Sequence, residues 1–258
     1  QLIGFGYRRV TMVDTDDEGR MLPQALARAL GGKPGPKIVI AQAGQINTGA
    51  FDPFTEIVAL AKSAGAWVHV DGAFGLWARA VPTLRHLTEG IEGADSWVTD
   101  GHKWLQVPYD CGFAIVRDRT IHQRAMTQWS SYLPTIGDGD RVPSAFVPEL
   151  SRRARGVPVY AMLRTLGRQG VADLVERHCV LARQFAALLA LEPGVRVLNA
   201  VSLNQVIVNF GEGDAASRRA ATEAVIARVQ KDGVCFAAGA QWRGDWVMRL
   251  SVTSGATQ

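Results

Sequence analysis

The sequence has few cysteines, no basic run and no apolar run of membrane length. Its three cysteines, Cys111, Cys179 and Cys235, are far apart and form no CxxC pair. This spacing argues against disulfides and a metal site, and it predicts a protein of the reducing cytoplasm. No apolar run approaches the roughly 20 residues that cross a membrane, so we expect no membrane partner. The net charge of +4 is not gathered into a Lys/Arg-rich run and predicts no nucleic-acid partner.

The composition that remains is that of a globular protein with a sizeable core. Of the 258 residues, 47% are hydrophobic and 20% are charged, which are proportions typical of folded domains. In the first half, strand-length apolar runs alternate with helical periodicity. We expect strands at 9–14, 37–43 and 112–116, and helices at 21–30 and 54–63. This alternation with short loops predicts an α/β fold with a mainly parallel sheet and flanking helices.

The second half begins with a long stretch that has no periodicity. Gly, Pro, Ser and Asp recur between residues 130 and 144, and we expect the whole stretch 120–147 to form an irregular loop. Helical periodicity returns at 148–167 and 171–191. The remaining pattern predicts a small α+β unit with a helix at 215–230 and strands at 206–210, 234–237 and 246–252.

Two apolar runs in the first half end on charged residues. Residues 67–70 are followed by Asp71, and residues 96–99 are followed by Asp100 and, three residues later, Lys103. Each run is typical of a buried strand, and ligands of open α/β sheets bind at the carboxyl edge of such strands. We therefore expect Asp71 and Lys103 to meet in one crevice. A lysine and a carboxylate placed together suit pyridoxal phosphate chemistry.

Two motifs make this expectation specific. Residues 69–75, HVDGAFG, resemble the HVDAAYGG motif of the group II pyridoxal-phosphate-dependent amino-acid decarboxylases. Residues 100–105, DGHKWL, resemble the D-x-HKW-L motif around the lysine of that family, and the spacing of 32 residues between Asp71 and Lys103 is also similar. The resemblance implies a fold-type I, pyridoxal-phosphate-dependent transferase-like fold with a small C-terminal domain.

The resemblance also implies roles for five residues of the two motifs. Lys103 would form the Schiff base with pyridoxal 5'-phosphate, and Asp71 would keep the pyridine nitrogen protonated. Ala73 would pack on the ring. His102 would contact the cofactor phosphate or the substrate carboxylate, and Asp100 would lie near the phosphate or orient His102. On residue type alone, Lys103 is a surface lysine and Asp71 caps a turn.

The loop after the run 37–43 supplies a further cofactor candidate. Thr48, with Gln45 and Asn47, would hydrogen-bond the ring hydroxyl; the alternative is a polar loop with an Asx turn. Some members of the family have a threonine where this chain has Ile46. This departure leaves the partner of the ring hydroxyl open.

Tyr132 lies 29 residues after the lysine, where the family has the tyrosine of its mobile catalytic loop. It would protonate the α-carbon of the substrate; the alternative is an amphipathic surface tyrosine. Arg152, Arg153 and Arg155 resemble the SRR-x-R segment of the family, in which an arginine supports the active site. Their alternative role is a solvated helix face.

The implied activity is decarboxylation of an L-amino acid, with an aromatic substrate favoured, by a cytoplasmic homodimer. The alternatives are other chemistry with the same cofactor (carbon–carbon lyase, aldehyde synthase or aminotransferase) and a truncated, non-catalytic chain. A phenylalanine replaces the loop tyrosine in aldehyde-forming relatives, so Tyr132 favours decarboxylation. We expect residues 1–128 to belong to the large domain, 129–147 to the catalytic loop, and 148–258 to a linking helix and an incomplete small domain. The N-terminal part of the family fold, with its phosphate loop and ring-stacking histidine, is expected to be missing.

Overall fold

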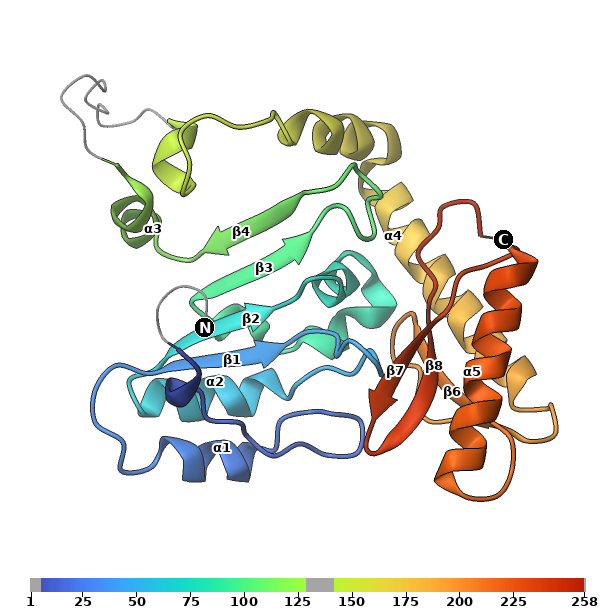
Figure 1. The fold of residues 1–258 in the computed structure, drawn as a ribbon. Helices are drawn as coiled ribbons and strands as arrows, with labels where there is room; N and C mark the ends of the chain where they lie inside the picture. Colours follow the sequence, from blue (N-terminus) through green and yellow to red (C-terminus); the bar gives the residue numbers. More distant parts are fainter. Residues whose placement is uncertain (1–5, 129–141, 258) are drawn as a thin grey trace.

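The computed structural model describes residues 6–128 and 142–257, which form two units built on separate four-stranded sheets (Figure 1). The first sheet occupies the N-terminal half of the chain and the second occupies the C-terminal part. Among the described helices, none combines the length and apolar composition that a membrane crossing requires.

The first sheet contains the strands β1 (Ile38–Gln42), β2 (Trp67–Asp71), β3 (Ser96–Asp100) and β4 (Gly112–Val116), in that order. The first three are parallel, whereas β4 is antiparallel to β3. Asp71 is aligned with Gln42 on one side and with Val98 on the other. Because parallel strands end at the same edge, the residues that follow β1, β2 and β3 emerge together.

Helices cover the buried face of this sheet. The α-helices are α1 (Pro23–Leu30) and α2 (Phe54–Ser63), and three 3-10 helices, η2 (Gly75–Ala80), η3 (Pro82–Thr88) and η4 (Ile91–Gly93), connect β2 to β3. The central strand residues Val68 and Val70 are fully buried and belong to one core with Phe54 and Ile57 of α2. The mainly parallel sheet with flanking helices that we predicted is therefore present.

The second sheet, with its helix, is called the small domain here. It contains the strands β5 (Val195–Val197), β6 (Gln205–Phe210), β7 (Ala238–Trp242) and β8 (Asp245–Ser251) in the order β5-β6-β8-β7, and all of its pairs are antiparallel. The helix α5 (Ala215–Asp232) packs on β6 and β8. The predicted small C-terminal α+β unit is thus confirmed.

The helix α4 (Gly156–Leu189) joins the two units (Figure 1). Gly167 interrupts it with a φ of 63°, a conformation that favours glycine. Beyond this kink, Val175 and Cys179 belong to the core of the first sheet, whereas Ala182 and Ala186 belong to the core of the small domain. One continuous helix therefore contributes to both cores.

Two predicted elements are wrong. Residues 9–14 form no strand; the 3-10 helix η1 (Tyr7–Arg9) is followed by extended chain in which Met12 is 85% exposed. The strand predicted at 234–237 lies instead at 238–242, because Val234 and Phe236 are largely exposed, at 91% and 77%. The apolar run marks an exposed segment that precedes the strand.

The stretch 120–147 is only partly irregular. It contains α3 (Arg119–Met126), which Asp118 caps by accepting hydrogen bonds from the N–H groups of Thr120 and Ile121, and the 3-10 helix η5 (Pro143–Phe146). The helix expected from residue 148 begins later, at Gly156.

Candidate active site

The carboxyl ends of β1, β2 and β3 are joined by backbone hydrogen bonds that continue beyond the strands. The N–H of Ala43 donates to the carbonyl of Asp71 at 2.8 Å, and the N–H of Asp100 donates to the carbonyl of Ala73 at 2.8 Å. The two motifs singled out in the sequence are therefore neighbours, and the residues after both strands form one edge.

Gly75 allows the turn after β2 to pass close to the end of β1. A Cβ atom at this position would lie 2.1 Å from the carbonyl oxygen of Ala43, which is backbone and cannot rotate away. Gly44 approaches the same turn from the β1 side with a φ of +91°, and a Cβ atom there would lie 2.9 Å from the Phe74 ring. Glycine is required at both positions for the strand ends to meet.

Lys103 lies beside this turn. Its Nζ is 5.6 Å from the centre of the Phe74 ring and 3.1 Å from Asp100 Oδ2, and 30% of its side chain is exposed. The amine is thus held near the surface of the site by a carboxylate and an aromatic ring. A group in this setting is accessible to a small reactive molecule.

His102 is held by three contacts. Its Nδ1 accepts a hydrogen bond from the N–H of Cys111 at 3.0 Å, its Nε2 lies 3.6 Å from Asp100 Oδ2, and its ring stacks on Tyr109 with centroids 4.1 Å apart. The acceptor role of Nδ1 leaves Nε2 as the atom that carries hydrogen in the neutral ring. Asp100 therefore contacts both His102 and Lys103, as in the alternative that it orients His102.

Asp71 is exposed at the end of β2. Its Oδ1 accepts a hydrogen bond from the N–H of Ala73 at 3.1 Å, which is the Asx-turn contact expected for Asp-Gly. No hydrogen bond to Oδ2 is found among the described residues, so this oxygen can accept from a ligand. The turn-capping and ligand-binding roles are therefore compatible.

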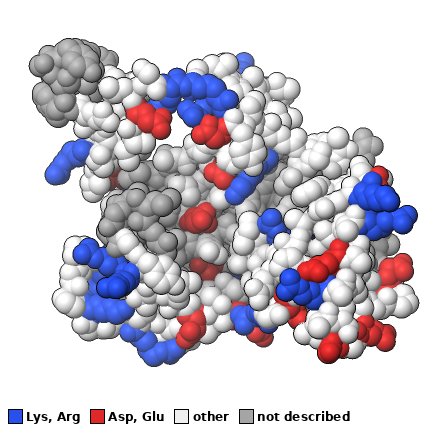
Figure 2. Space-filling view, viewed as in Figure 1, with Lys and Arg blue, Asp and Glu red and all other residues white. Residues whose placement is uncertain are grey.

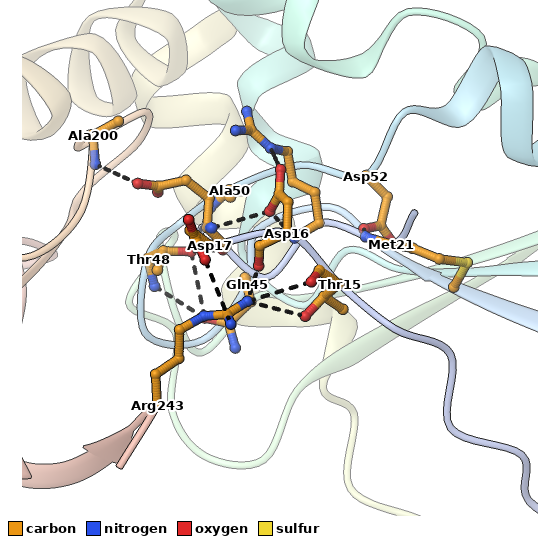
Figure 3. Close-up of polar contacts among 12 residues, drawn as sticks. Thr15, Asp16, Asp17, Met21, Gln45, Thr48, Ala50, Asp52, Ala200 and Arg243 are labelled. Carbon is orange, nitrogen blue, oxygen red and sulfur yellow. Dashed lines mark hydrogen bonds and ion pairs between the residues drawn. The ribbon is translucent and has the colours of Figure 1, made fainter. Parts of the chain in front are cut away.

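Thr48 lies inside the protein. It is fully buried, its hydroxyl donates to the carbonyl of Glu18 at 2.6 Å, and it accepts from the N–H of Ala50 at 3.2 Å (Figure 3). Its own carbonyl accepts from the Asn199 side chain at 2.9 Å. Thr48 thus links distant segments through its hydroxyl and its backbone carbonyl, and the burial of the hydroxyl disfavours the predicted contact with a cofactor hydroxyl.

Gln45 supports the same loop, since its Oε1 accepts from the N–H groups of Asn47 at 2.6 Å and Thr48 at 3.0 Å. Ile46, at the departure from the family pattern, is 50% exposed, and its carbonyl accepts from Arg249 of β8 at 3.1 Å. The loop after β1 is thereby attached to the small domain.

The acidic turn near the N-terminus forms a second attachment to the small domain (Figure 3). Arg243, between β7 and β8, contacts Thr15, the carbonyl of Asp16 and, at 3.6 Å, the Asp17 carboxylate. Glu18 accepts from the N–H of Ala200 at 3.0 Å, while burial raises the pKa of its carboxyl. These contacts fix the small domain relative to the acidic turn, which the hydrogen bond from Thr48 to Glu18 joins to the loop after β1.

The arginines before α4 hold the segment after the lysine loop. Arg155 Nη2 lies 2.9 Å from Asp110 Oδ1, Arg153 lies 3.5 Å from the same oxygen, and Arg152 pairs with Glu149 at 3.1 Å. Figure 2 shows basic and acidic atoms side by side over this segment. The Arg155 guanidinium lowers the pKa of the Asp110 carboxyl. These arginines are thus neither a simple solvated helix face nor direct contacts of Lys103.

Tyr132 lies outside the described residues.

One buried polar contact near the lysine was not predicted from the sequence: Trp104 Nε1 donates to Nδ1 of His178 at 2.8 Å. The only available signal was a histidine on the otherwise apolar face of a predicted helix. Such a pattern more often marks an ordinary core histidine.

Comparison with known proteins supports the family resemblance found in the sequence. The family described as "Pyridoxal-dependent decarboxylase conserved domain" matches residues 3–210. The chain is 28% identical to the aromatic-L-amino-acid decarboxylase of Drosophila lebanonensis, covering 98% of this chain and 63% of that protein. It is also 28% identical to the histidine decarboxylase of Mus musculus, covering 96% and 38%. The chain spans about half the length of the curated relatives that it matches.

Solved structures share the fold. The crystal structure of Oryza sativa TDC with PLP and tryptamine aligns with a TM-score of 0.90 and 25% identity, covering 100% of this chain and 56% of that one. Mouse CSAD in the apo form aligns with a TM-score of 0.89 and 23% identity. The predicted fold-type I architecture is confirmed, and it is represented here by part of the fold.

Proposed function

The chain belongs to the pyridoxal-dependent decarboxylase family, and on this premise we propose that it carries the lysine of an amino-acid decarboxylase that uses pyridoxal 5'-phosphate. The observation that carries the proposal is the position of Lys103. Its amine lies 5.6 Å from the ring of Phe74, and Phe74 belongs to the turn that follows Asp71. A nucleophilic amine and an accessible carboxylate therefore reach one strand edge.

The residues at this edge suit the cofactor chemically. When bound, pyridoxal 5'-phosphate supplies an aldehyde for covalent attachment and a ring that accepts the electron pair released as carbon dioxide leaves. Lys103 offers the amine for this attachment. The Oδ2 of Asp71 can hold the ring nitrogen in its protonated state, and the small side chain of Ala73 leaves room for a flat ring.

Asp100 orients both the lysine and His102. Asp100 Oδ2 lies 3.1 Å from Lys103 Nζ and 3.6 Å from His102 Nε2, so one carboxylate sets the direction of both groups. With Nδ1 engaged by a backbone N–H, His102 has its Nε2 hydrogen available for a phosphate or a substrate carboxylate. Thr48 is not assigned a cofactor contact, because its hydroxyl is buried.

The substrate that we propose is an L-amino acid with an aromatic side chain, and the products are the amine and carbon dioxide. The names of the first relatives support this class, although the mouse histidine decarboxylase is equally similar at 28% identity. Tyr132 is proposed as the proton donor to the α-carbon, within a catalytic loop at 129–147. We further propose a large domain at 1–128 and a linking helix with the small domain at 148–258. The proposed assembly is a homodimer, and its proposed location is the cytoplasm.

Reductive labelling tests the assignment of the lysine. After incubation with pyridoxal 5'-phosphate and borohydride, peptide mapping should place the pyridoxyl group on Lys103. Lys62 is the internal comparison, because it is paired with Asp95 away from this edge. A Lys103→Arg variant should lose the label. A label on Lys62 or Lys37, or retention of the label in the variant, would contradict the proposal.

A further inference from the structure

Three successive carbonyls near the C-terminus accept hydrogen bonds from side chains around the lysine loop. We call residues 253–255, which follow β8, the C-terminal strap. Gln106 Nε2 donates to its first carbonyl, His178 Nε2 donates to its second, Ser254 O, at 2.9 Å, and Arg177 Nη2 donates to its third at 3.0 Å. Gln106 has a φ of 55°, which is uncommon for a residue other than glycine. The strap is thus joined to both α4 and the lysine loop.

His178 is the central donor of this group, and its two contacts define its chemical form. The indole N–H of Trp104 only donates, so Nδ1 of His178 must accept at 2.8 Å and carries no hydrogen. The carbonyl of Ser254 only accepts, so Nε2 must carry the hydrogen. The ring is fully buried and nearly parallel to the indole, at an interplanar angle of 7°. The contacts therefore fix a neutral ring in one tautomer.

Trp104 brings this arrangement to the lysine. It is 1% exposed and directly follows Lys103, whose own side chain is 30% exposed. The buried indole, rather than the partly exposed lysine, anchors the backbone of this loop. Its single polar atom is held by His178 alone among the described residues.

We propose that His178 is a positioning residue that fixes Lys103 through the Trp104 indole and couples this position to the small domain through the C-terminal strap. The inference rests on the proposed function, because the place of Lys103 matters for reaction only if the lysine carries the cofactor.

The electrostatic surroundings of His178 favour the neutral ring. Burial lowers the pKa of His178; the hydrogen bond to Ser254 opposes this effect, and the charge of Arg177 adds to it. A proton on Nδ1 would remove the acceptor of the Trp104 N–H and leave two donors face to face. Because an unpaired buried polar group is unfavourable, the neutral form is the one that holds the loop.

Two conservative variants separate the two contacts. The side-chain oxygen of asparagine can take the place of Nδ1, so His178→Asn keeps an acceptor for Trp104 and loses the hydrogen bond to Ser254. The longer amide of glutamine reaches the position of Nε2, so His178→Gln keeps the hydrogen bond to Ser254 and loses the one to Trp104. We expect kcat to fall about tenfold in His178→Gln and less than about threefold in His178→Asn, because only the former loses the hydrogen bond to Trp104, the residue next to the lysine. KM should change little in either variant.

A signal independent of activity is the indole N–H resonance of Trp104, assigned by its loss in Trp104→Phe. It should keep its wild-type shift and slow exchange in His178→Asn, whereas in His178→Gln it should move and exchange faster. Equal losses of kcat in the two variants, or an unchanged indole resonance in His178→Gln, would show that His178 is only a core residue.

Trp104→Phe provides the second route if the His178 variants unfold. It removes the indole donor while keeping an aromatic ring, and kcat should again fall about tenfold. In the Trp104→Phe background, His178→Gln should cause no further loss where it folds; an additive loss overturns the coupling. Borohydride labelling of the wild-type protein separates the two proposals, since absence of label on Lys103 refutes the proposed function instead.

Discussion

Gly75→Ala tests the close passage of the β2 turn against the end of β1. The new methyl carbon would lie 2.1 Å from the carbonyl oxygen of Ala43 and 2.8 Å from the backbone nitrogen of Gly44. Both atoms are backbone, so no side chain can rotate to relieve the contact. The strand ends must separate, or the turn that contains Phe74 must shift.

The expected cost follows from this geometry. Adding a methyl group to a well-packed site usually costs about 1–3 kcal/mol, and we expect about 3 kcal/mol here because the opposing atoms are backbone. For a chain of this size, about 1 kcal/mol shifts Tm by roughly 2–4 °C, so Tm should fall by roughly 6–12 °C. Labelling of Lys103 should weaken as well, since Phe74 contacts its amine.

Gly156→Ala is the matched control. Gly156 is the first residue of α4, and a Cβ atom there meets nothing within 4 Å. Because alanine favours a helix over glycine, the control should be neutral or more stable by up to about 1 kcal/mol. Thermal unfolding followed by circular dichroism compares the two. A Gly75→Ala protein with the Tm of the wild type would refute the close approach of Gly75 and Ala43.

Three further outcomes are expected. Asp71→Asn should keep much of the cofactor affinity but lower kcat by on the order of a hundredfold or more, because the ring nitrogen loses its carboxylate; kcat near that of the wild type would contradict this role. Tyr132→Phe should reduce amine formation and, in the presence of dioxygen, which is reduced to hydrogen peroxide as water is consumed, yield aldehyde and ammonia from the same substrate; product analysis that finds only amine, at the wild-type rate, would exclude Tyr132 as the proton donor. Burial lowers the pKa of both His69 and His178 below 6.5, so the unfolded chain binds more protons and stability should fall as pH drops below about 6.5. Urea unfolding at several pH values gives the unfolding free energy as a function of pH, and this dependence should be weaker in His178→Asn than in the wild type. An equal pH dependence in the two proteins would count against this explanation.

The strands that carry the site were predictable because local sequence determines their ends. The run 67–70 is apolar and β-branched, and Asp71-Gly72 is turn chemistry that stops it. Parallel order then places the residues after β2 and β3 at one edge. For this reason, the meeting of the Asp71 and Lys103 segments could be predicted without coordinates.

Contacts between distant segments could not be predicted in this way. Thr48 is buried because it bonds Glu18 and Asn199, which are 30 and 151 residues away in the chain. Residues 9–14 have an apolar pattern, but among the described strands none lies beside them to pair with, so the pattern alone forms no sheet. Val234 and Phe236 likewise predicted a buried strand, yet within the described part of the chain both side chains are largely exposed.

The shared helix α4 has a consequence for cooperativity. The stretch from Val171 to Ala186 is continuous helix and supplies side chains to the cores of both units. Loss of either core would expose the apolar side chains that the helix contributes to it, so the two sheets are expected to open as one foldon. In native-state hydrogen exchange, the amides of Val70 in β2 and Val208 in β6 should exchange with the same opening free energy and the same denaturant dependence.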